Sequence, residues 1–507
     1  MQPLNKILLR KGFPFPSNLE VSEYPEGLPE RVIQFGEGNF LRAFVDWMFH
    51  RLNKEGLFNG RVVVVQPLPQ GLVDKLNEQD GLYTLLLYGY QEGKLVEKRE
   101  IIGSISRALN SYTQWEEVLA CATNPDLEFI ISNTTEAGIA YDPEDRLELN
   151  PPRSFPGKIT AFLYRRFQHF QGDPPKGMIL LPCELIDRNG DNLKRIVLQL
   201  AQDWGLPVEF REWVDQYNLF LNTLVDRVVP GYPRDRAEML AQELGYRDDL
   251  MVVGELFHLW VIEGPEEIKE KLPFHRAGLN VIWTSDLTPY RTRKVRILNG
   301  IHTATAAPAF LAGVDTVREA VEHPVWGSFM KEAIFEEIIP SMDLDMEMLK
   351  EFAREVLERF RNPYIIHYWQ SILLNTTSKY QTRVLPSILG YLERKGALPL
   401  RLVFSLAALA YLFKEGKISG RKFYGQRLKG EFTLEDDPKA LAFWQEAWEK
   451  YQGTEGSLCE VARFILRRSD IWGQDLTPLP GLVDLLARYL GIIMSRGTEA
   501  ALAAFLG

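Results

Sequence analysis

The residues of this chain best suited to chemistry are a lysine, an asparagine and a histidine that lie close together in the sequence. They are Lys294, Asn299 and His302, and a run of apolar residues follows them directly. Asn299 and His302 are three residues apart, so a helix would present them on one side. Lys294 precedes Asn299 by five residues and is off that side by angle, but its long stem could swing back from a turn leading into the helix. The three side chains could therefore face one pocket.

Such a trio suits proton transfer to a carbonyl oxygen. Lys294 would act as general acid and base, while Asn299 and His302 would polarise the oxygen. A lysine does this near neutral pH only if its pKa is lowered, and burial together with the neighbouring cations Arg293 and Arg296 would lower it. The alternative is a solvated basic turn that caps a buried helix.

The elements that must position these residues begin with a strand, a glycine turn and a helix. Residues 31–35 predict a strand, Gly36 and Gly38 follow at once, and helical periodicity then runs to Gly56. Glycines let the backbone approach a pyrophosphate, whose charge is met by free N–H groups at the helix start. Leu41 stands where a third glycine would complete the usual pattern, so an ordinary tight turn is the alternative. The candidate cofactor-binding residues of this stretch are Phe35, Gly36, Gly38, Asn39 and Phe40.

A second strand, over residues 62–65, ends at Gln66, where folds that prefer NAD usually place an acid for the ribose hydroxyls. Gln66 can also hydrogen-bond a ribose, although it does not repel a 2′-phosphate. No lysine or arginine follows before Lys75, so nothing nearby attracts that phosphate. The sequence therefore favours NAD as the cofactor and Gln66 as one of its contacts.

A third buried strand, over residues 128–132, ends in a polar segment. Ligands of open α/β sheets bind at the carboxyl ends of strands. We therefore expect cofactor or substrate contacts in this segment, from Asn133, Thr135 and Glu136.

Further segments extend the α/β pattern. Residues 178–182 predict a strand with a helix after it, at about residues 192–204. Residues 82–90 and 94–102 predict a hairpin, and residues 255–263 predict a strand or buried edge that closes the first domain.

Beyond about residue 285 strands cease in the predicted pattern and helical periodicity takes over. Helices are expected at residues 349–360, 403–413, 440–451 and 482–493. We predict an α/β protein with a Rossmann-type dinucleotide-binding domain over residues 1–285. A mostly α-helical domain for substrate binding and catalysis would occupy residues 286–507, and a cleft between the two would place Lys294 at its seam.

Composition narrows the class of protein. The chain has 507 residues, of which 46% are hydrophobic and 25% charged, and this suits a globular enzyme of two domains. The net charge of −10 argues against a nucleic-acid partner, which needs a concentrated positive field. The longest apolar runs, 304–314 and 403–413, are too short to span a bilayer, and we expect no signal peptide, because the first ten residues have no long apolar run.

The cysteines and histidines predict neither disulfides nor a metal. The three cysteines are far apart, which fits a reduced cytoplasm. The seven histidines show no metal-ligand spacing, so a metal-dependent hydrolase is not expected.

Several of these segments together resemble the long-chain mannitol dehydrogenase family of polyol and uronate oxidoreductases. The segment from Asn222 through Val225-Asp226-Arg227-Val228 to Pro230 is similar to the family's signature, and the spacing of Lys294, Asn299 and His302 is similar to its catalytic motif. The resemblance implies a Rossmann-type domain, a helical domain, and metal-independent hydride transfer involving NAD. It also implies that Lys294 is the general acid and base and that Asp226 and Lys379 lie on the substrate side.

One departure from the mannitol-type members concerns the substrate. Leu185 stands where those members have a second asparagine for the oxyanion hole. The segments 34–44 and 183–186 are closer to the branch that reduces the keto-uronate tagaturonate to altronate. That substrate carries a carboxylate, which needs a cation. The candidates are Lys379, Arg383 and Arg293.

Other functions remain open at this point. Within the family, the alternatives are reduction of fructuronate and oxidation of mannitol at C2. From a different class, the chain could be a nucleotide-binding sensor without catalysis, or an isomerase that reuses its cofactor. The sequence leaves the oligomeric state undetermined.

Overall fold

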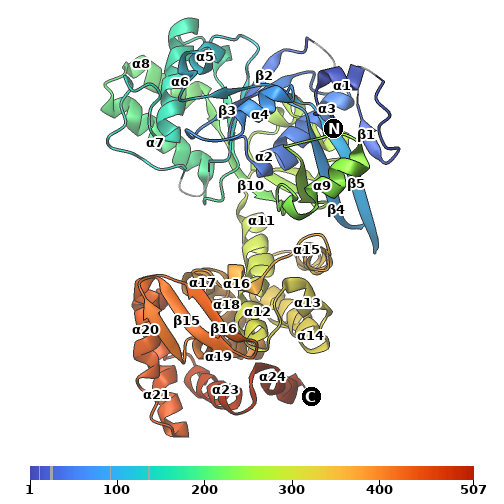
Figure 1. Ribbon diagram of the computed structural model, residues 1–507. Coiled ribbons are helices and arrows are strands. Elements are labelled where there is room, and N and C mark those ends of the chain that lie inside the picture. The colour runs from blue at the N-terminus through green and yellow to red at the C-terminus, as the bar shows by residue number, and fades with distance from the viewer. Residues whose placement is uncertain (11, 23–26, 92, 135–137, 507) are drawn as a thin grey trace. The chain divides into compact units, whose positions relative to one another are not determined.

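The chain divides into two compact units, Met1–Leu287 and Thr288–Gly507, in a computed structural model (Figure 1). The structure describes residues 1–10, 12–22, 27–91, 93–134 and 138–506. Thr135 and Glu136, two of the predicted cofactor contacts, lie outside the described residues.

The first unit is built around a six-stranded parallel sheet in the order β6-β3-β2-β7-β8-β9. Its strands are β2 (Glu30–Phe35), β3 (Arg61–Gln66), β6 (Ile105–Asn110), β7 (Phe129–Ser132), β8 (Ile179–Pro182) and β9 (Leu219–Phe220). The earliest strand, β2, is central, and later strands are added outward on one side and then on the other. This is the order of a doubly wound nucleotide-binding fold, and it confirms the predicted Rossmann-type architecture.

Helices cover both faces of this sheet, which is why its strands are apolar on both sides. Alternate side chains of the run Val62–Val65 in β3 pack into two separate buried clusters. One cluster includes side chains of α3 (Trp47–Lys54), and the other includes side chains of α6 (Phe155–Phe170) and α7 (Asn189–Asp203). A strand buried on both faces needs a continuous apolar run rather than an alternating one.

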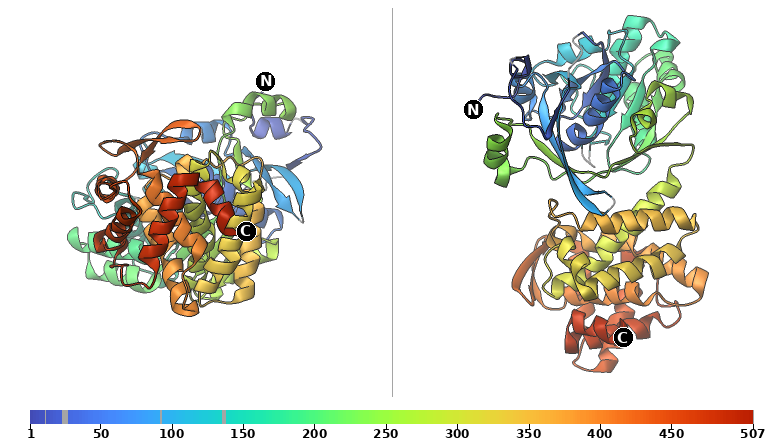
Figure 2. Two further views of the ribbon diagram at one scale, coloured as in Figure 1. Left: turned by 90° about the horizontal axis from the view of Figure 1, so that it is seen from below. Right: turned by 90° about the vertical axis from the view of Figure 1, so that its right-hand side faces the viewer.

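Two smaller sheets complete the first unit, in the orders β1-β5-β4-β11 and β10-β12-β13. Their strands are β1 (Leu19–Val21), β4 (Tyr83–Gln91), β5 (Lys94–Ile102), β10 (Asn222–Asp226), β11 (Val252–Glu255), β12 (Leu259–Glu263) and β13 (Val281–Thr284). The predicted hairpin is confirmed as the antiparallel pair of β4 and β5, the long blue strands in the right-hand view of Figure 2.

The prediction of one strand or buried edge over residues 255–263 holds only for Leu259–Glu263, which form β12, because Glu255 is the last residue of β11. The chain leaves one sheet and enters another there, since β11 pairs with β4 whereas β12 pairs with β10. Periodicity records that a segment is extended and apolar, but it does not record which partner the segment pairs with.

The second unit is mostly helical, as predicted. The expected helices are α15 (Met346–Phe360), α19 (Leu400–Leu412), α20 (Pro438–Trp448) and α23 (Leu482–Arg496). Two helices of the unit, α12 (Gly300–Leu311) and α19, are buried on nearly all sides, which explains their largely apolar composition. Among the described residues, no helix combines the length and apolarity needed to cross a bilayer.

The prediction that strands cease beyond residue 285 is wrong. A three-stranded antiparallel sheet is formed by β14 (Gly416–Ser419), β15 (Lys422–Arg427) and β16 (Gly430–Glu435). Its strands are short and largely polar, so they carry a weak signal. Their buried face presents Phe423 to Phe413 and Phe432 to Phe310, at ring-centroid distances of 5.0 and 5.2 Å.

Candidate active site

The glycine turn after β2 is the first candidate region. Gly36 has φ +125°, and a Cβ there would lie 2.9 Å from the carbonyl oxygen of Asn133, so a side chain is excluded on two grounds. Gly38 precedes the short helix α2 (Asn39–Leu41), and a Cβ on Gly38 would meet nothing within 4 Å. The backbone is therefore tightly packed at the first glycine and open at the second, where a ligand could approach it.

A buried arginine holds the residues that follow Gly36 in this turn. Arg42 starts a π-helix, η1 (Arg42–Asp46), that separates α2 from α3. Its guanidinium donates to the carbonyl oxygens of Glu37 (3.2 Å) and Leu250 and to Oδ1 of Asn39 (2.8 Å). The Asn39 side chain, predicted to contact the cofactor, is thus bound to Arg42, and Phe40 stacks on Phe44 at 5.0 Å. Both side chains support the turn from within the protein.

Gln66 also makes internal contacts. Its side chain is buried, with Nε2 donating to the carbonyl oxygen of Leu68 (2.8 Å) and Oε1 accepting from the N–H of Val73 (3.3 Å). A Cβ on Gly71 would lie 2.2 Å from Oε1 of Glu37 and 2.5 Å from Gln66, so this loop packs directly on the glycine turn. The observed geometry makes Gln66 a support of that loop, whereas the sequence predicted a ribose contact.

A glutamate that was not predicted from the sequence to be a site residue joins the carboxyl ends of β7 and β8. Glu184 accepts hydrogen bonds from Oγ of Ser132 (3.0 Å) and from N–H and Oγ1 of Thr134 (3.0 and 2.9 Å). Burial raises its pKa, and these donors partly offset the increase. Beside it, Asn133 donates to the carbonyl oxygen of Cys183 (2.8 Å). The only sequence signal was an acid placed just after a buried strand.

The signature segment of the resemblance begins in β10 and continues beyond that strand to Pro230. Asp226 is the last residue of β10 and is buried. The guanidinium of Arg227 donates to the carbonyl oxygens of Ala43 (2.5 Å) and Glu255 (2.8 Å) and lies 4.3 Å from the ring centroid of Trp47. Burial lowers the pKa of Arg227 to about 9. Arg227 therefore ties the end of β10 to the π-helix that follows the glycine turn.

The second candidate region lies in the second unit and begins with another π-helix. The π-helix η5 spans Lys294–Asn299, between α11 (Thr288–Arg293) and α12. A π-helix pairs residues five apart, whereas an α-helix pairs residues four apart. Lys294 and Asn299 therefore lie on the same side of the helix, and His302 follows one α-helical turn later. The sequence predicted Lys294 in a turn that leads into the helix, whereas the π-helix places it on the same side as Asn299.

His302 packs against three aromatic rings. It is 8% exposed and stacks on Phe360 at a centroid distance of 4.3 Å, with His367 and Trp369 edge-on at 5.9 and 6.2 Å. Burial, followed by the nearby charge of Arg359, lowers the pKa of His367. This packing fixes the plane of the His302 ring.

The predicted substrate cations fall in different surroundings within the second unit. Arg293 is buried, with its guanidinium 4.4 Å from the ring centroid of Phe352. Lys379 and Arg383 belong to α17 (Thr376–Arg383), where the Lys379 ammonium donates to the carbonyl oxygen of Ile372 (2.9 Å). A Cβ on Gly300 would lie 3.1 Å from the carbonyl oxygen of Arg383, so α17 ends against the stretch from Asn299 to His302.

A further cation, Arg296, is built into the same π-helix. Its guanidinium donates to the hydroxyls of Ser387 (2.7 Å) and Ser341 (2.9 Å), and burial lowers its pKa to about 10. A positive charge held in a low-dielectric setting favours the neutral form of an amine nearby. Arg296 was predicted to act in this way on Lys294, which lies two residues earlier in the same π-helix, and this effect stays a prediction.

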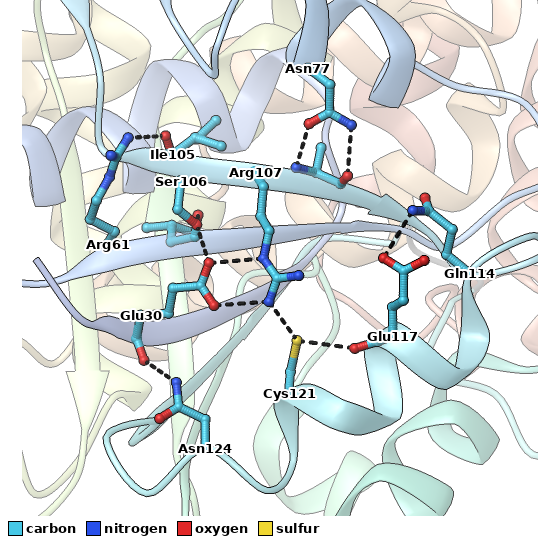
Figure 3. Close-up of polar contacts among 12 residues, drawn as sticks. Glu30, Arg61, Asn77, Ile105, Ser106, Arg107, Gln114, Glu117, Cys121 and Asn124 are labelled. Atoms are coloured by element: carbon cyan, nitrogen blue, oxygen red, sulfur yellow. Dashed lines mark hydrogen bonds and ion pairs between the residues drawn. The ribbon is translucent and has the colours of Figure 1, made fainter. Parts of the chain in front are cut away.

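The opposite, amino-terminal edge of the large sheet has a structural network. There Arg107 donates to both carboxylate oxygens of Glu30 (2.9 and 3.0 Å) and lies 3.6 Å from Sγ of Cys121 (Figure 3). Burial raises the pKa of that thiol to about 11. A cavity of about 770 Å³ at this edge is lined by Arg31 and Glu128, which pair at 2.6 Å. Among the described residues, no group of three His, Cys, Asp or Glu side chains could hold a metal.

Comparisons with known families match nearly the whole chain. Residues 30–275 match the model of the mannitol dehydrogenase Rossmann domain, and residues 286–491 match that of the mannitol dehydrogenase C-terminal domain. The altronate oxidoreductase of Bacillus subtilis (strain 168) is 48% identical over 485 residues, which cover 96% of this chain and 97% of that protein. The altronate oxidoreductase of Escherichia coli O6:K15:H31 is 44% identical, covering 98% of this chain and 99% of that protein.

Two solved structures share the fold. A D-sorbitol dehydrogenase in substrate-free form superposes with a TM-score of 0.81 at 22% identity, covering 99% of this chain and all of that chain. Mannitol 2-dehydrogenase of Pseudomonas fluorescens, solved as a ternary complex with NAD and D-mannitol, gives a TM-score of 0.73 at 22% identity, covering 100% of this chain and 99% of that chain.

Proposed function

Because the chain belongs to the mannitol dehydrogenase family, we propose that it is an NAD-dependent oxidoreductase that interconverts tagaturonate and altronate. The observation that carries the proposal is the 44–48% identity, over nearly the full length of both chains, to proteins named altronate oxidoreductase. The resemblance seen in the sequence, to the branch that reduces keto-uronates, supports the same substrate.

The first unit would bind the dinucleotide at the glycine turn. Gly38 leaves open space beside the backbone, and the carboxyl ends of β2 and β7 meet at Gly36 and Asn133. These features fit a pyrophosphate, and bound NADH would supply hydride to the substrate carbonyl carbon. The side chains of Asn39 and Gln66 support the turn in this proposal.

The second unit would supply the proton chemistry. Lys294 would donate a proton to the oxygen of the developing alcohol, and in the reverse direction it would remove that proton. Asn299 and His302, on the same side of the helix, would donate hydrogen bonds to the reacting oxygen or to an adjacent hydroxyl. Of the predicted cations, Arg383 would bind the substrate carboxylate, because α17 ends beside Asn299 and Gly300. Lys379, Arg293 and the acid Asp226 remain predicted substrate contacts.

A substrate panel tests this function. Consumption of NADH would be followed with tagaturonate, fructuronate and fructose at equal concentrations, and repeated with NADPH. We expect the highest kcat/KM with tagaturonate and NADH, and undiminished activity in a strong chelator. Equal rates with fructose would contradict a uronate substrate. A chain that binds NADH without consuming it would be a sensor, and one that interconverts sugars without net NADH loss would be an isomerase.

Three sequence predictions stay predictions. They are a functional boundary near residue 285, a cytoplasmic location, and the absence of nucleic-acid and membrane partners. The two family models end and begin on either side of that boundary, at residues 275 and 286, which supports it.

A further inference from the structure

A buried glutamine holds the peptide that follows Gly36. Nε2 of Gln34, in β2, donates to the carbonyl oxygen of Gly36 (3.0 Å) and to Oδ2 of Asp46 (3.0 Å), and both side chains are fully buried. In a trans peptide the N–H points opposite to the carbonyl. With the Gly36 carbonyl fixed inward by Gln34, the N–H of Glu37 is therefore directed outward.

The outward N–H is suited to an anionic ligand. In the structure the side chain of Glu37 faces this N–H and that of Leu72; burial raises the pKa of Glu37, and these two N–H groups partly offset the increase. A carboxyl oxygen thus already faces these donors. A pyrophosphate oxygen has the same requirement, as expected for a glycine turn at a helix start.

The Gln34–Asp46 pair lacks one proton donor. Oε1 of Gln34 and Oδ1 of Asp46 are both buried acceptors without a hydrogen-bond partner among the described residues. The remaining polar atoms of the two side chains, Nε2 of Gln34 and Oδ2 of Asp46, are hydrogen-bonded to each other. Buried acceptors are nearly always paired. One proton on Asp46 would supply the missing donor and complete a cyclic acid–amide pair.

We infer that protonated Asp46 and Gln34 form such a pair, and that the pair positions the Gly36–Glu37 peptide to bind the pyrophosphate of the dinucleotide. This inference rests on the proposed cofactor-binding function. Asp46 and Gln34 are positioning residues, since they would act on the cofactor through the backbone. Burial supports the protonated form, because it raises the pKa of Asp46 to about 7.

The charged and titratable groups around Asp46 do not provide another donor in the described contacts. Arg42, one turn earlier, attracts the ionised carboxylate, but its guanidinium donates hydrogen bonds to Glu37, Asn39 and Leu250. His50, one turn later, pairs with Glu100 of β5 at 3.2 Å.

Other packed elements contribute groups that are already engaged. Tyr83 of β4 donates to the carbonyl oxygen of Arg42 (2.6 Å), and Glu255 of β11 accepts from the N–H of Val228 (2.6 Å). From the loop before β6, Ser104 donates to the Asp46 carbonyl oxygen (2.7 Å).

Deprotonation should weaken cofactor binding for two reasons. The ionised carboxylate leaves Oε1 of Gln34 without a donor, and it draws Arg42 away from the carbonyl oxygen of Glu37 and from Asn39. It also places a negative charge in an apolar region behind the pyrophosphate site. Asp46→Asn mimics the protonated acid, because its amide can donate to Oε1 and accept from Nε2.

The test is the Kd of NADH, measured by fluorescence from about pH 6.5 to about pH 9 on the full chain. NADH itself has no group that titrates in this range. For the unaltered chain we expect Kd to rise about three- to tenfold, the effect of one buried hydrogen bond. For D46N we expect the low-pH Kd at every pH. An unchanged pH dependence in D46N would overturn the inference and would point to a titrating group other than Asp46.

Two further variants keep the inference falsifiable. Gln34→Met keeps the volume and removes the donor to Gly36, so Kd should rise at all pH values and lose its pH dependence. Asp248→Asn is the matched control: Asp248 is also buried and accepts from Nε2 of a glutamine, Gln79 (2.8 Å), but its other donors are the N–H groups of Thr84 and Leu250. It should lower Tm and leave the slope of Kd against pH unchanged.

Thermal unfolding separates the two proposals. If the unaltered chain bound neither NADH nor NAD at any pH, the proposed function would fail, together with the positioning role. The acid–amide pair would still be tested by the change of Tm with pH. Between about pH 5 and pH 8, Tm should fall in the unaltered chain and should fall less in D46N. Equal Tm profiles would overturn the acid–amide pair.

Discussion

Two regions of the molecule carry the candidate groups, and both contain a π-helix, but they use it differently. In the glycine-turn region, residues 34–46, polar side chains bond to the protein's own backbone: Gln34 to Gly36, and Arg42 to Glu37. In the lysine region, residues 294–302, the π-helix instead aligns side chains along one side of a helix. The first arrangement leaves backbone N–H groups to bind a ligand, and the second leaves side chains to react.

The largest effect is expected in the lysine region. Lys294→Ala should lower kcat about 10³-fold, because a positioned general acid contributes on that order. The Kd of NADH should stay within about twofold, since binding depends on the other region. Steady-state rates and fluorescence titration would measure the two quantities. If K294A kept most of its turnover, the assignment of proton transfer to the lysine region would be wrong.

The π-helix itself can be tested by deleting one residue from it. Removal of Val295 should convert the π-helix to an α-helix and shift Lys294 against Asn299 by one position. We expect kcat to fall about as far as in K294A, with Tm lowered by no more than a typical core change. Deleting Ala333, in the π-helix η6 (Ala333–Ile338), is the control, and kcat should change far less. Equal losses would mean that the register of η5 has no special role.

Asn299→Ala should have an intermediate effect on rate. Loss of one donor to a developing oxyanion costs about 10²- to 10³-fold in kcat. Thr303→Ala, one turn along the same helix, is a suitable control, because its hydroxyl donates to the Asn299 carbonyl (2.9 Å). A rise in KM for the substrate with kcat unchanged would assign Asn299 to substrate binding alone.

In the glycine-turn region the effect should appear in binding. A Cβ at Gly36 would lie 2.9 Å from the Asn133 carbonyl oxygen at φ +125°, a strain of roughly 1–3 kcal/mol. Gly36→Ala should therefore raise the Kd of NADH about tenfold or more. Gly38→Ala is the matched variant, because a Cβ on Gly38 would meet nothing within 4 Å. This substitution should leave the folded protein unchanged and alter only the binding of a ligand. If neither variant altered Kd, the turn would not be the cofactor site.

The smallest expected effect is on stability and has a defined sign with pH. The pKa of Asp46 is raised from 3.8 to about 7, so the folded chain binds more protons than the unfolded chain between these values. Folding stability should then fall as pH rises through this window and stay low above it. Asp46→Asn should reduce that slope. Chemical denaturation at about pH 5 and pH 8 would measure the difference.

Most of the backbone pattern was predictable because it is encoded locally. The runs 31–35, 62–65 and 178–182 gave strands at the expected places, since a sheet covered on both faces demands continuous apolar segments. The glycine turn was predictable from Gly36, for which the structure shows both a positive φ and a close contact. The end of β11 at Glu255 and the start of β12 at Leu259 were not separable, because the division depends on which sheet each strand joins.

The residues that carry the candidate chemistry were also predictable from the sequence, whereas the groups that bond to the side chains of the site were not. Lys294, Asn299 and His302 were chosen by type and spacing, but the π-helix that aligns them depends on packing around residues 294–299. Contacts such as Arg42 to Leu250, 208 residues apart, bind side chains that the sequence assigned to a ligand.

The sequence alone determined the α/β class of the first unit, the helical character of the second, and the residue types available for hydride and proton transfer. Only the tertiary structure decided that Gln66 and Asn39 bond within the protein, that Glu184 joins two strand ends, and that Asp46 meets Gln34. The physical reason is that periodicity and turn preferences act over a few residues, while a buried polar group is satisfied by whatever distant group the fold places against it.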